Sequence, residues 1–163
     1  MKTRTVGSFG ILILLIFCLT LQGEIYSGKC IGVSDGDTIS VLKAGRSVKI
    51  RLEGIDCPEG GQDFGAKAKR FTSELVFGKD VQVKEVTLDR YGRIVARVYV
   101  DGKDTSLELV KAGLAWHFKR YSSDPILASA EQEARSLKKE IWSVPNPIPP
   151  WEYRGSGKRK KTQ

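Results

Sequence analysis

The chain has 163 residues, of which 40% are hydrophobic and 28% are charged. This length and balance are typical of one soluble globular domain, and the lack of internal repeats excludes a repeat architecture. Lys and Arg outnumber Asp and Glu by 27 to 19, which gives a formal net charge of +8. The excess favours a polyanionic partner such as nucleic acid, although charge alone does not identify one.

The first 23 residues have the organisation of a signal peptide. Two basic residues, Lys2 and Arg4, precede an apolar run from Ile11 to Leu21, and Gly23 offers a small residue for cleavage. The run is short for a membrane span, which favours export to the periplasm or the medium, with no stable membrane span after cleavage. An uncleaved anchor in the inner membrane is the alternative, because the residue two places before the cut is not small.

Removal of that segment leaves a net charge of +6 and two cysteines, Cys30 and Cys57, in a compartment that permits disulfides. Two interpretations stay open. Either the two cysteines form a bridge, or Cys30 is a buried apolar residue of the first strand and Cys57 is a loop residue.

From residue 26 to residue 100 the sequence predicts mainly strands, because apolar residues alternate with polar ones. The expected strands are 31–33, 38–42, 48–52, 81–86 and 94–100, with turns at 34–37, 44–45 and 89–92. A helix over Ala66–Val76, with Asp63 as its N-cap and Gly78 after its end, lies between the third and fourth strands. Five strands with an inserted helix suggest an α+β fold, mainly β, built on a five-stranded OB-type barrel.

Two more helices are expected after the strands, which makes about three in all. They are Ser106–Ala112, ended by Gly113, and Leu127–Lys139, with Asp124 as N-cap and Pro125 at the first position. Beyond Trp142 four prolines predict an extended strap, from which Trp151 and Tyr153 pack back on the barrel. The basic run Lys158–Lys161 is expected to be disordered, as a solubilising tail or as an arm for nucleic acid.

Three short segments carry residues that suggest a chemistry. Two are acidic, Asp35-Gly36-Asp37-Thr38 and Asp56-Cys57-Pro58-Glu59, and Arg51 lies between them. The third, Asp89-Arg90-Tyr91-Gly92-Arg93, supplies a second arginine. Carboxylate oxygens suit Ca²⁺ or Mg²⁺, and a planar guanidinium matches phosphate oxygens with two parallel hydrogen bonds. The set indicates metal-dependent cleavage of phosphodiester bonds.

In order, spacing and identity, these segments resemble the thermonuclease (staphylococcal nuclease-like) family, and the resemblance runs over residues 26–142. Each segment alone is an ordinary turn or loop, so the specificity comes from the three together. The resemblance fixes the barrel topology. It implies a nuclease domain at 24–143, after a signal peptide at 1–23 and before a Pro-rich strap and basic tail at 144–163.

The resemblance implies that the carboxylates of Asp37 and Asp56 and the backbone carbonyl of Cys57 bind Ca²⁺. The family more typically has Thr at position 57, but a main-chain ligand tolerates a Cys side chain. Zinc is disfavoured independently, because His117 is the sole histidine and no Cys-x-x-Cys spacing exists. His117 is expected to be a packing or rim residue.

The resemblance also implies the catalytic and substrate-binding residues. Glu59 orients or deprotonates the attacking water, and Arg51 and Arg93 stabilise the charge that grows on the phosphate oxygens. Expected substrate contacts come from Arg90, Tyr91 and Tyr121. Asp35 is expected to support the turn of the metal site. The loop from Glu59 to Gly65 is shorter than is typical of the family, so the resemblance implies no preference among DNA, RNA, single strands and duplexes.

The function that the resemblance implies is that of an exported, monomeric, calcium-dependent endonuclease, a phosphodiesterase that hydrolyses DNA and RNA and leaves 3′-phosphate ends. Two alternatives belong to other classes of protein. One is a non-catalytic module that binds nucleic acid, although every expected catalytic position is filled here. The other is an accessory protein anchored in the envelope by its N-terminal segment.

Overall fold

The computed structural model of the chain describes residues 23–156. The expected signal segment, apart from Gly23, and the basic run Lys158–Lys161 lie outside the described residues. Within 23–156, no helix combines the length and the apolar character that crossing a membrane would need.

Five long strands form a closed barrel, which confirms the expected fold class. They are β1 (Ile25–Asp35), β2 (Thr38–Lys43), β3 (Arg46–Leu52), β5 (Asp80–Leu88) and β6 (Ile94–Val100). Neighbours pair antiparallel in the order β3-β2-β1-β5-β6, and a parallel pairing of β3 with β6 closes the barrel. A short strand, β7 (Lys103–Asp104), adds to the edge of β6.

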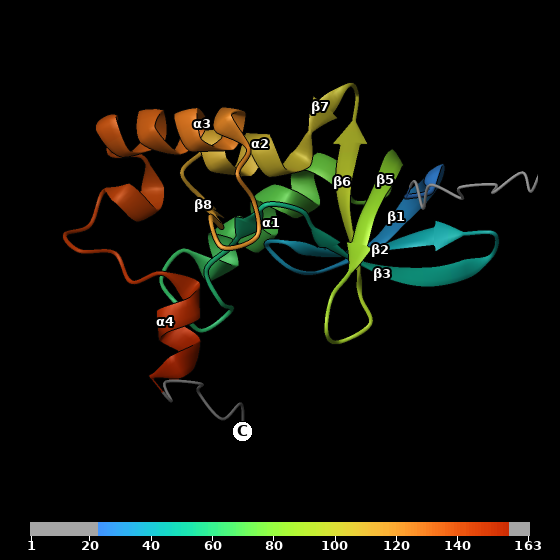
Figure 1. Ribbon diagram of the computed structural model, residues 1–163, viewed down its shortest axis with the longest axis horizontal. Helices are drawn as coiled ribbons and strands as arrows, with labels where there is room; N and C mark the ends of the chain where they lie inside the picture. The colour runs from blue at the N-terminus through green and yellow to red at the C-terminus, as the bar shows by residue number, and fades with distance from the viewer. Residues whose placement is uncertain (1–22, 157–163) are drawn as a thin grey trace, which may run out of the picture.

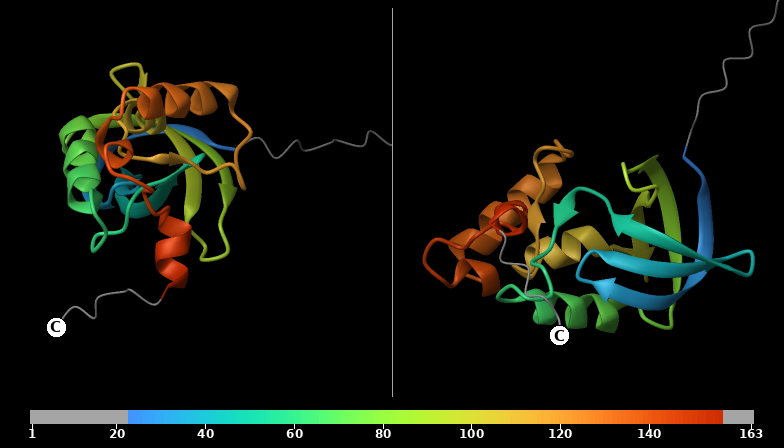
Figure 2. Two further views of the ribbon diagram at one scale, coloured as in Figure 1. Left: turned by 90° about the vertical axis from the view of Figure 1, so that its left-hand side faces the viewer. Right: turned by 90° about the horizontal axis from the view of Figure 1, so that it is seen from below.

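Helices gather at the end of the molecule away from the β2–β3 hairpin (Figure 1). They are α1 (Gly65–Val76), α2 (Thr105–Lys111), α3 (Pro125–Ser136) and α4 (Pro150–Gly155), with a 3-10 turn at Glu140–Trp142. A second small sheet joins β4 (Ile55–Asp56) to β8 (Trp116–His117). Two further views show that α4 lies on the opposite side of this end from α3 (Figure 2).

The three expected helices are present, with corrections at their ends. Asp124 caps α3 as expected, because its side chain accepts a hydrogen bond from the backbone N–H of Ile126. Asp63 is wrong as the cap of α1, since Phe64, in the left-handed conformation (φ 66°), occupies that position without a side-chain bond. Gly65 then passes against the Glu59 carbonyl, where a Cβ would lie only 1.9 Å from the oxygen.

The fourth helix is the main departure from the expected secondary structure. The prolines after Trp142 were expected to keep the whole strap extended, but residues 150–155 form α4 with Pro150 in its first turn. A proline is compatible with that position, because the first N–H groups of a helix have no partner within the helix. Trp151 packs back on the domain, but against the segment of β8 and not on the barrel strands as expected: its ring stacks on Phe118 with 5.2 Å between centroids.

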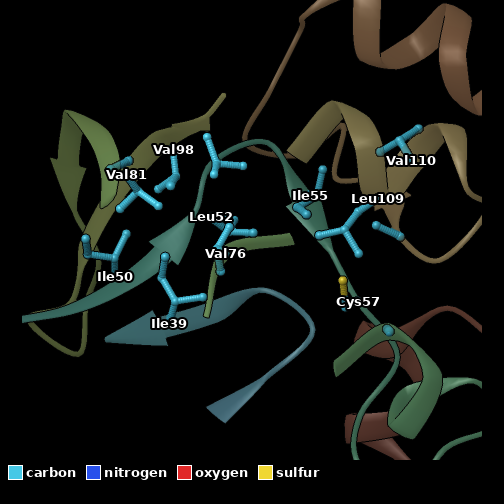
Figure 3. Close-up of a cluster of buried hydrophobic side chains, with 14 of the residues drawn as sticks. Ile39, Ile50, Leu52, Ile55, Cys57, Val76, Val81, Val98, Leu109 and Val110 are labelled. Atoms are coloured by element: carbon cyan, nitrogen blue, oxygen red, sulfur yellow. The ribbon is translucent and has the colours of Figure 1, made fainter. Parts of the chain in front are cut away.

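The hydrophobic core fills the barrel and continues under α1 and α2. Ile50 and Leu52 of β3 point inward and are buried, because alternate residues of a strand face the same side. Figure 3 shows them with Val98 of β6, and shows Leu109 of α2 beside Ile55 of β4. The barrel core therefore extends to β4, which begins the acidic segment.

One arginine joins the barrel to the helices. Arg97 of β6 forms an ion pair with Asp124, the N-cap of α3, and another at 3.1 Å with Glu53, which follows β3. Its guanidinium also lies 3.9 Å from Asp104, whose side chain caps α2. The starts of two helices are thus fixed to the outer face of the barrel.

Both remaining cysteines are buried as free thiols. The structure thus contradicts the interpretation in which Cys30 and Cys57 form a bridge. The Cys30 thiol donates to the carbonyl of Gly32 at 3.5 Å, and Cys57 belongs to the hydrophobic core. Burial raises the pKa of both thiols, so both are protonated at neutral pH.

The turn between β1 and β2 has room only for glycine at position 36. A Cβ on Gly36 would lie 2.7 Å from the Cβ of Cys57 and 2.9 Å from the Cβ of Ala68. The carbonyl of Gly36 also accepts a hydrogen bond of 2.6 Å from the Thr72 hydroxyl of α1. The turn is therefore packed directly against both the acidic segment and α1.

Gly36→Ala is expected to lower the free energy of unfolding by about 1–3 kcal/mol, because the added methyl overpacks this contact. Gly32→Ala in β1, the strand before this turn, is the matched control, since its Cβ would meet nothing closer than 3.6 Å. The control should stay within about 0.5 kcal/mol of the unmodified protein. Urea unfolding of the three proteins measures the difference, and equal stability of the two variants would contradict the packing described here.

Candidate active site

Two carboxylates are buried side by side at one end of the barrel. Asp37 lies in the turn after β1 and is 3% exposed, whereas Asp56 ends β4 and is 0% exposed. The backbone of Asp37 accepts from the N–H of Leu52 at 2.8 Å, which ties the turn to the end of β3. Asp56 pairs with Trp116 of β8, which fixes the second carboxylate.

Arg51 brings these two carboxylates together. Its guanidinium forms an ion pair with Asp37 and another with Asp56, the latter at 2.6 Å. The same Nη2 also donates to the carbonyl of Ile55 at 3.3 Å. Arg51 is the cross-strand partner of Thr38, one residue after Asp37, so β-sheet register sets this geometry. Its polar strand position thus faces a buried acidic pair and not solvent.

Cys57 belongs to the same unit through its backbone. Its N–H donates to Oδ2 of Asp37 at 2.7 Å, while its side chain lies in the hydrophobic core. The thiol therefore does not face the acidic pair and is not placed to bind a metal ion. The backbone carbonyl is the one oxygen that this residue could offer to a metal ion.

The residues fit a hard divalent cation, although they do not form a complete cage. Within residues 23–156, no three side chains of the types His, Cys, Asp and Glu converge as metal ligands. The expected set needs only two carboxylates and a carbonyl, with water and substrate as the remaining ligands. Arg51 contacts both Asp37 and Asp56, so the two acids already converge on one centre of positive charge.

Glu59 lies in the loop that leads from β4 to α1. Its side chain is 40% exposed, in contrast to the buried aspartates, and its backbone N–H donates to Oε1 of Gln62 at 3.2 Å. This carboxylate shares a partner, Arg154, with Asp56 and is also reached by water, so it is suited to act on a water molecule.

Arg154 is a residue of this site that the sequence analysis missed. From α4 it donates to both oxygens of Asp56, at 2.7 Å and 3.3 Å, and to Glu59 at 2.6 Å. Burial would lower the pKa of this guanidinium, but its bonds to Asp56 and Glu59 raise the pKa overall, so it stays charged. The available signal was the Pro-Pro pair before Trp-Glu-Tyr-Arg, which permits a helix start there.

The segment that carries Arg154 is docked by few contacts. The Tyr153 hydroxyl donates to the carbonyl of Gly61 at 2.8 Å, and Gln62 donates to the carbonyl of Ile148 at 2.6 Å. Trp151 stacks on Phe118 and meets the edge of Trp116 at 5.6 Å. The C-terminal segment therefore covers the loop that contains Glu59.

The β5–β6 turn holds the second expected arginine apart from the acidic pair. Arg93 is bonded to Asp89 at 2.7 Å, and among the described residues no ion pair joins it to Asp37, Asp56 or Glu59. Bonds from the Arg93 backbone and side chain outweigh burial and lower the pKa of Asp89. Arg51 is the partner of Val95 in the β3–β6 ladder, and Arg93 precedes β6 by one residue, so the turn that carries Arg93 begins at the end of β3 where Arg51 lies.

The residues expected to bind substrate lie on exposed turns. Arg90 sits over the ring of Tyr91, with 4.9 Å to the centroid, and Tyr91 is exposed. Tyr121 is also exposed, with its ring edge on Phe118 at 4.9 Å. His117 is buried, and its Nε2 lies 3.3 Å from the Ser122 hydroxyl, which makes it a packing residue as expected.

Comparison with known proteins bears directly on this arrangement. The family model described as staphylococcal nuclease homologue matches residues 49–144. An uncharacterized endonuclease of Escherichia coli is 41% identical over 144 residues, covering 88% of this chain and 94% of that protein. A micrococcal nuclease of Shigella flexneri is 37% identical over 144 residues, covering 82% of this chain and 83% of that protein. The chain therefore belongs to the staphylococcal nuclease homologue family, which confirms the resemblance and places it among the nucleases, a class of hydrolases.

Proposed function

We propose that this protein is a calcium-dependent endonuclease that is exported and hydrolyses DNA and RNA, leaving 3′-phosphate ends. The single observation that carries the proposal is the convergence of Asp37 and Asp56, both buried, on the guanidinium of Arg51. Burying two carboxylates costs several kcal/mol each unless cations compensate them, so a fold seldom retains such a pair without use for it.

Each residue has a distinct role in this proposal. Asp37, Asp56 and the carbonyl of Cys57 would hold Ca²⁺, which when bound supplies positive charge beside the reacting phosphate. Glu59 accepts a proton from the attacking water at a carboxylate oxygen. Arg51 places its fork against a non-bridging phosphate oxygen, where charge grows during the displacement.

Residues outside the acidic cluster would hold the polymer. Arg93 exchanges its ion pair with Asp89 for one with a phosphate of the substrate. The Arg93 and Asp89 side chains are both partly exposed, so their ion pair is weak, and Arg93 remains paired with an anion after the exchange. Arg90, Tyr91 and Tyr121 contact phosphate and base, and aromatic stacking accepts any base. The exposed position of these groups suits a long, variable substrate.

Location and assembly are part of the same proposal. The signal-like residues 1–23 direct the nuclease domain, 24–143, to the periplasm or the medium, where the protein works as a monomer. Anchoring of the uncleaved N-terminus in the inner membrane is the alternative, and cell fractionation separates the two. The proline strap and basic tail at 144–163 follow the domain.

Nuclease activity is expected to require Ca²⁺, because a guanidinium of the site can pair with the carboxylates but cannot coordinate the phosphate and the attacking water as a divalent ion does. Purified protein is incubated with mixed single-stranded DNA and RNA in Ca²⁺, in excess EGTA, and in EGTA followed by Ca²⁺. Cleavage should stop in EGTA and return on addition of Ca²⁺. Undiminished cleavage in EGTA would contradict the metal assignment.

Glu59→Gln should reduce kcat by about 10²- to 10⁴-fold, since the amide cannot accept the proton, and should leave nucleotide affinity nearly unchanged. Glu74→Gln on the exposed face of α1 removes the same charge away from the site and serves as the control. Steady-state kinetics on an oligonucleotide separate kcat from KM. If turnover stays near that of the control, Glu59 is only a loop residue.

Arg51→Lys should lower kcat by about 10²- to 10³-fold, because an ammonium keeps the charge but cannot donate as a fork to two carboxylates and a phosphate. Arg70→Lys on α1 makes the same exchange at an exposed position. Kinetics are measured alongside thermal unfolding, so that lost activity is not mistaken for lost folding. An active Arg51→Lys protein would show that the fork geometry is not used.

A further inference from the structure

Arg154 of α4 occupies the carboxylate that a divalent cation would need. Both oxygens of Asp56 are already engaged, Oδ1 by Arg51 at 2.6 Å and Oδ2 by Arg154 at 2.7 Å. Arg154 also takes Oε1 of Glu59 at 2.6 Å. A cation that coordinates Asp56 would meet the positive charge of Arg154 within hydrogen-bond distance of its own ligand. Arg154 and a divalent cation therefore compete for the same carboxylate.

The charges of the site lead to the same conclusion. Three carboxylates, those of Asp37, Asp56 and Glu59, face two guanidinium groups, Arg51 and Arg154. Asp56 is 0% exposed, and a buried carboxylate without a cation is strongly destabilising. A divalent ion with Arg51 alone would balance the three acids, whereas Arg154 is required when that ion is missing. The site needs one of the two cations, and both together give an excess of positive charge.

The docking of α4 rests on the side chains of Trp151, Tyr153 and Arg154. The helix has six residues, too few to be stable on its own. It is held by the contacts of Trp151 and Tyr153 and by the ion pairs of Arg154 with Asp56 and Glu59, and those ion pairs are what a cation at Asp56 would break. A cavity of about 370 Å³ lies between this segment and the loop before α1, lined among others by Pro58, Gln62, Val144 and Ile148. Residues 144–153 thus contact the loop before α1 at separate points and leave a cavity between them.

We propose that Arg154 is a positioning residue of the nuclease site: it holds Asp56 and Glu59 in the metal-free protein and is displaced from Asp56 when the divalent cation binds. Metal binding and release of α4 are then one linked event. While α4 is docked, Glu59 is occupied and the loop around it is covered, so the protein cuts only after the cation has opened the site. This inference rests on the proposed function of the acidic pair.

Arg154→Ala tests the competition directly. Its affinity for Ca²⁺, measured by calorimetry on the full chain, should rise by about tenfold, because the ion no longer displaces an internal competitor. In EGTA the variant should melt at a lower temperature than the unmodified protein, and saturating Ca²⁺ should remove most of that difference. Arg70→Ala on the exposed face of α1 is the control and should change neither quantity.

A second variant, Tyr153→Phe, keeps the inference testable if Arg154→Ala does not fold without metal. Tyr153→Phe removes the hydroxyl that binds Gly61 and leaves every carboxylate contact intact, so it should tighten Ca²⁺ binding in the same direction by about two- to fivefold. Hydrogen exchange at the amides of residues 151–156 should be faster with Ca²⁺ than with EGTA, since α4 is then undocked.

The outcomes separate this inference from the proposed function. If the unmodified protein binds no Ca²⁺ at all, the proposed metal site itself is wrong. If it binds Ca²⁺ with an affinity that neither Arg154→Ala nor Tyr153→Phe changes, the metal site stands and Arg154 is only a structural ion pair. Protection of α4 that increases with Ca²⁺ would also overturn the inference, because the strap would then close over the bound ion.

Discussion

The burial of Asp37 and Asp56 next to each other is the constraint on which this structure depends. Two carboxylates at this depth repel each other and lose their hydration, so they need compensating cations within hydrogen-bond distance. The fold supplies Arg51 from the barrel wall and Arg154 from the C-terminal helix. The need of the site for positive charge therefore explains why Arg51 and Arg154, which are far apart in the sequence, meet at the same carboxylate of Asp56.

The barrel holds the two acids in place through contacts that leave little freedom. Closure of β3 on β6 and pairing of β2 with β3 set Arg51 opposite the turn that carries Asp37. The contact of Gly36 with Cys57 presses this turn against the acidic segment. Glu59 and Arg154 stand on a loop and a short helix, where fewer contacts restrain them. The buried acids thus lie on the part of the site with the most contacts, and Glu59 and Arg154 lie on the part with fewer.

Much of this arrangement could be predicted from the sequence. Alternation of apolar residues located the five strands, and Asp124 before Pro125 marked the start of α3, because these signals are local. The grouping of Asp37, Asp56 and Arg51 followed from a family pattern that spans the whole domain. Strand periodicity alone predicts that Arg51 faces solvent. Only the family pattern predicted that Arg51 pairs with buried acids.

What could not be predicted depended on contacts between distant segments. Arg154 lies 98 residues from Asp56 along the chain, and no spacing rule connects them. The prolines before α4 suggested an extended strap, although the same residues also permit a helix start, and tertiary packing of Trp151 on Phe118 decided between the two. The state of Cys30 and Cys57 was likewise decided by where each side chain packs and not by their number.

The measurement that tests this account most directly is a crystal structure of the full chain grown with Ca²⁺. The account predicts one ion at about 2.3–2.6 Å from oxygens of Asp37 and Asp56 and from the carbonyl of Cys57, which are the usual distances for Ca²⁺ ligands. It also predicts that Arg154 is no longer within hydrogen-bond distance of Asp56. An ion bound elsewhere, or an Arg154 still bonded to Asp56 beside a bound ion, would contradict it.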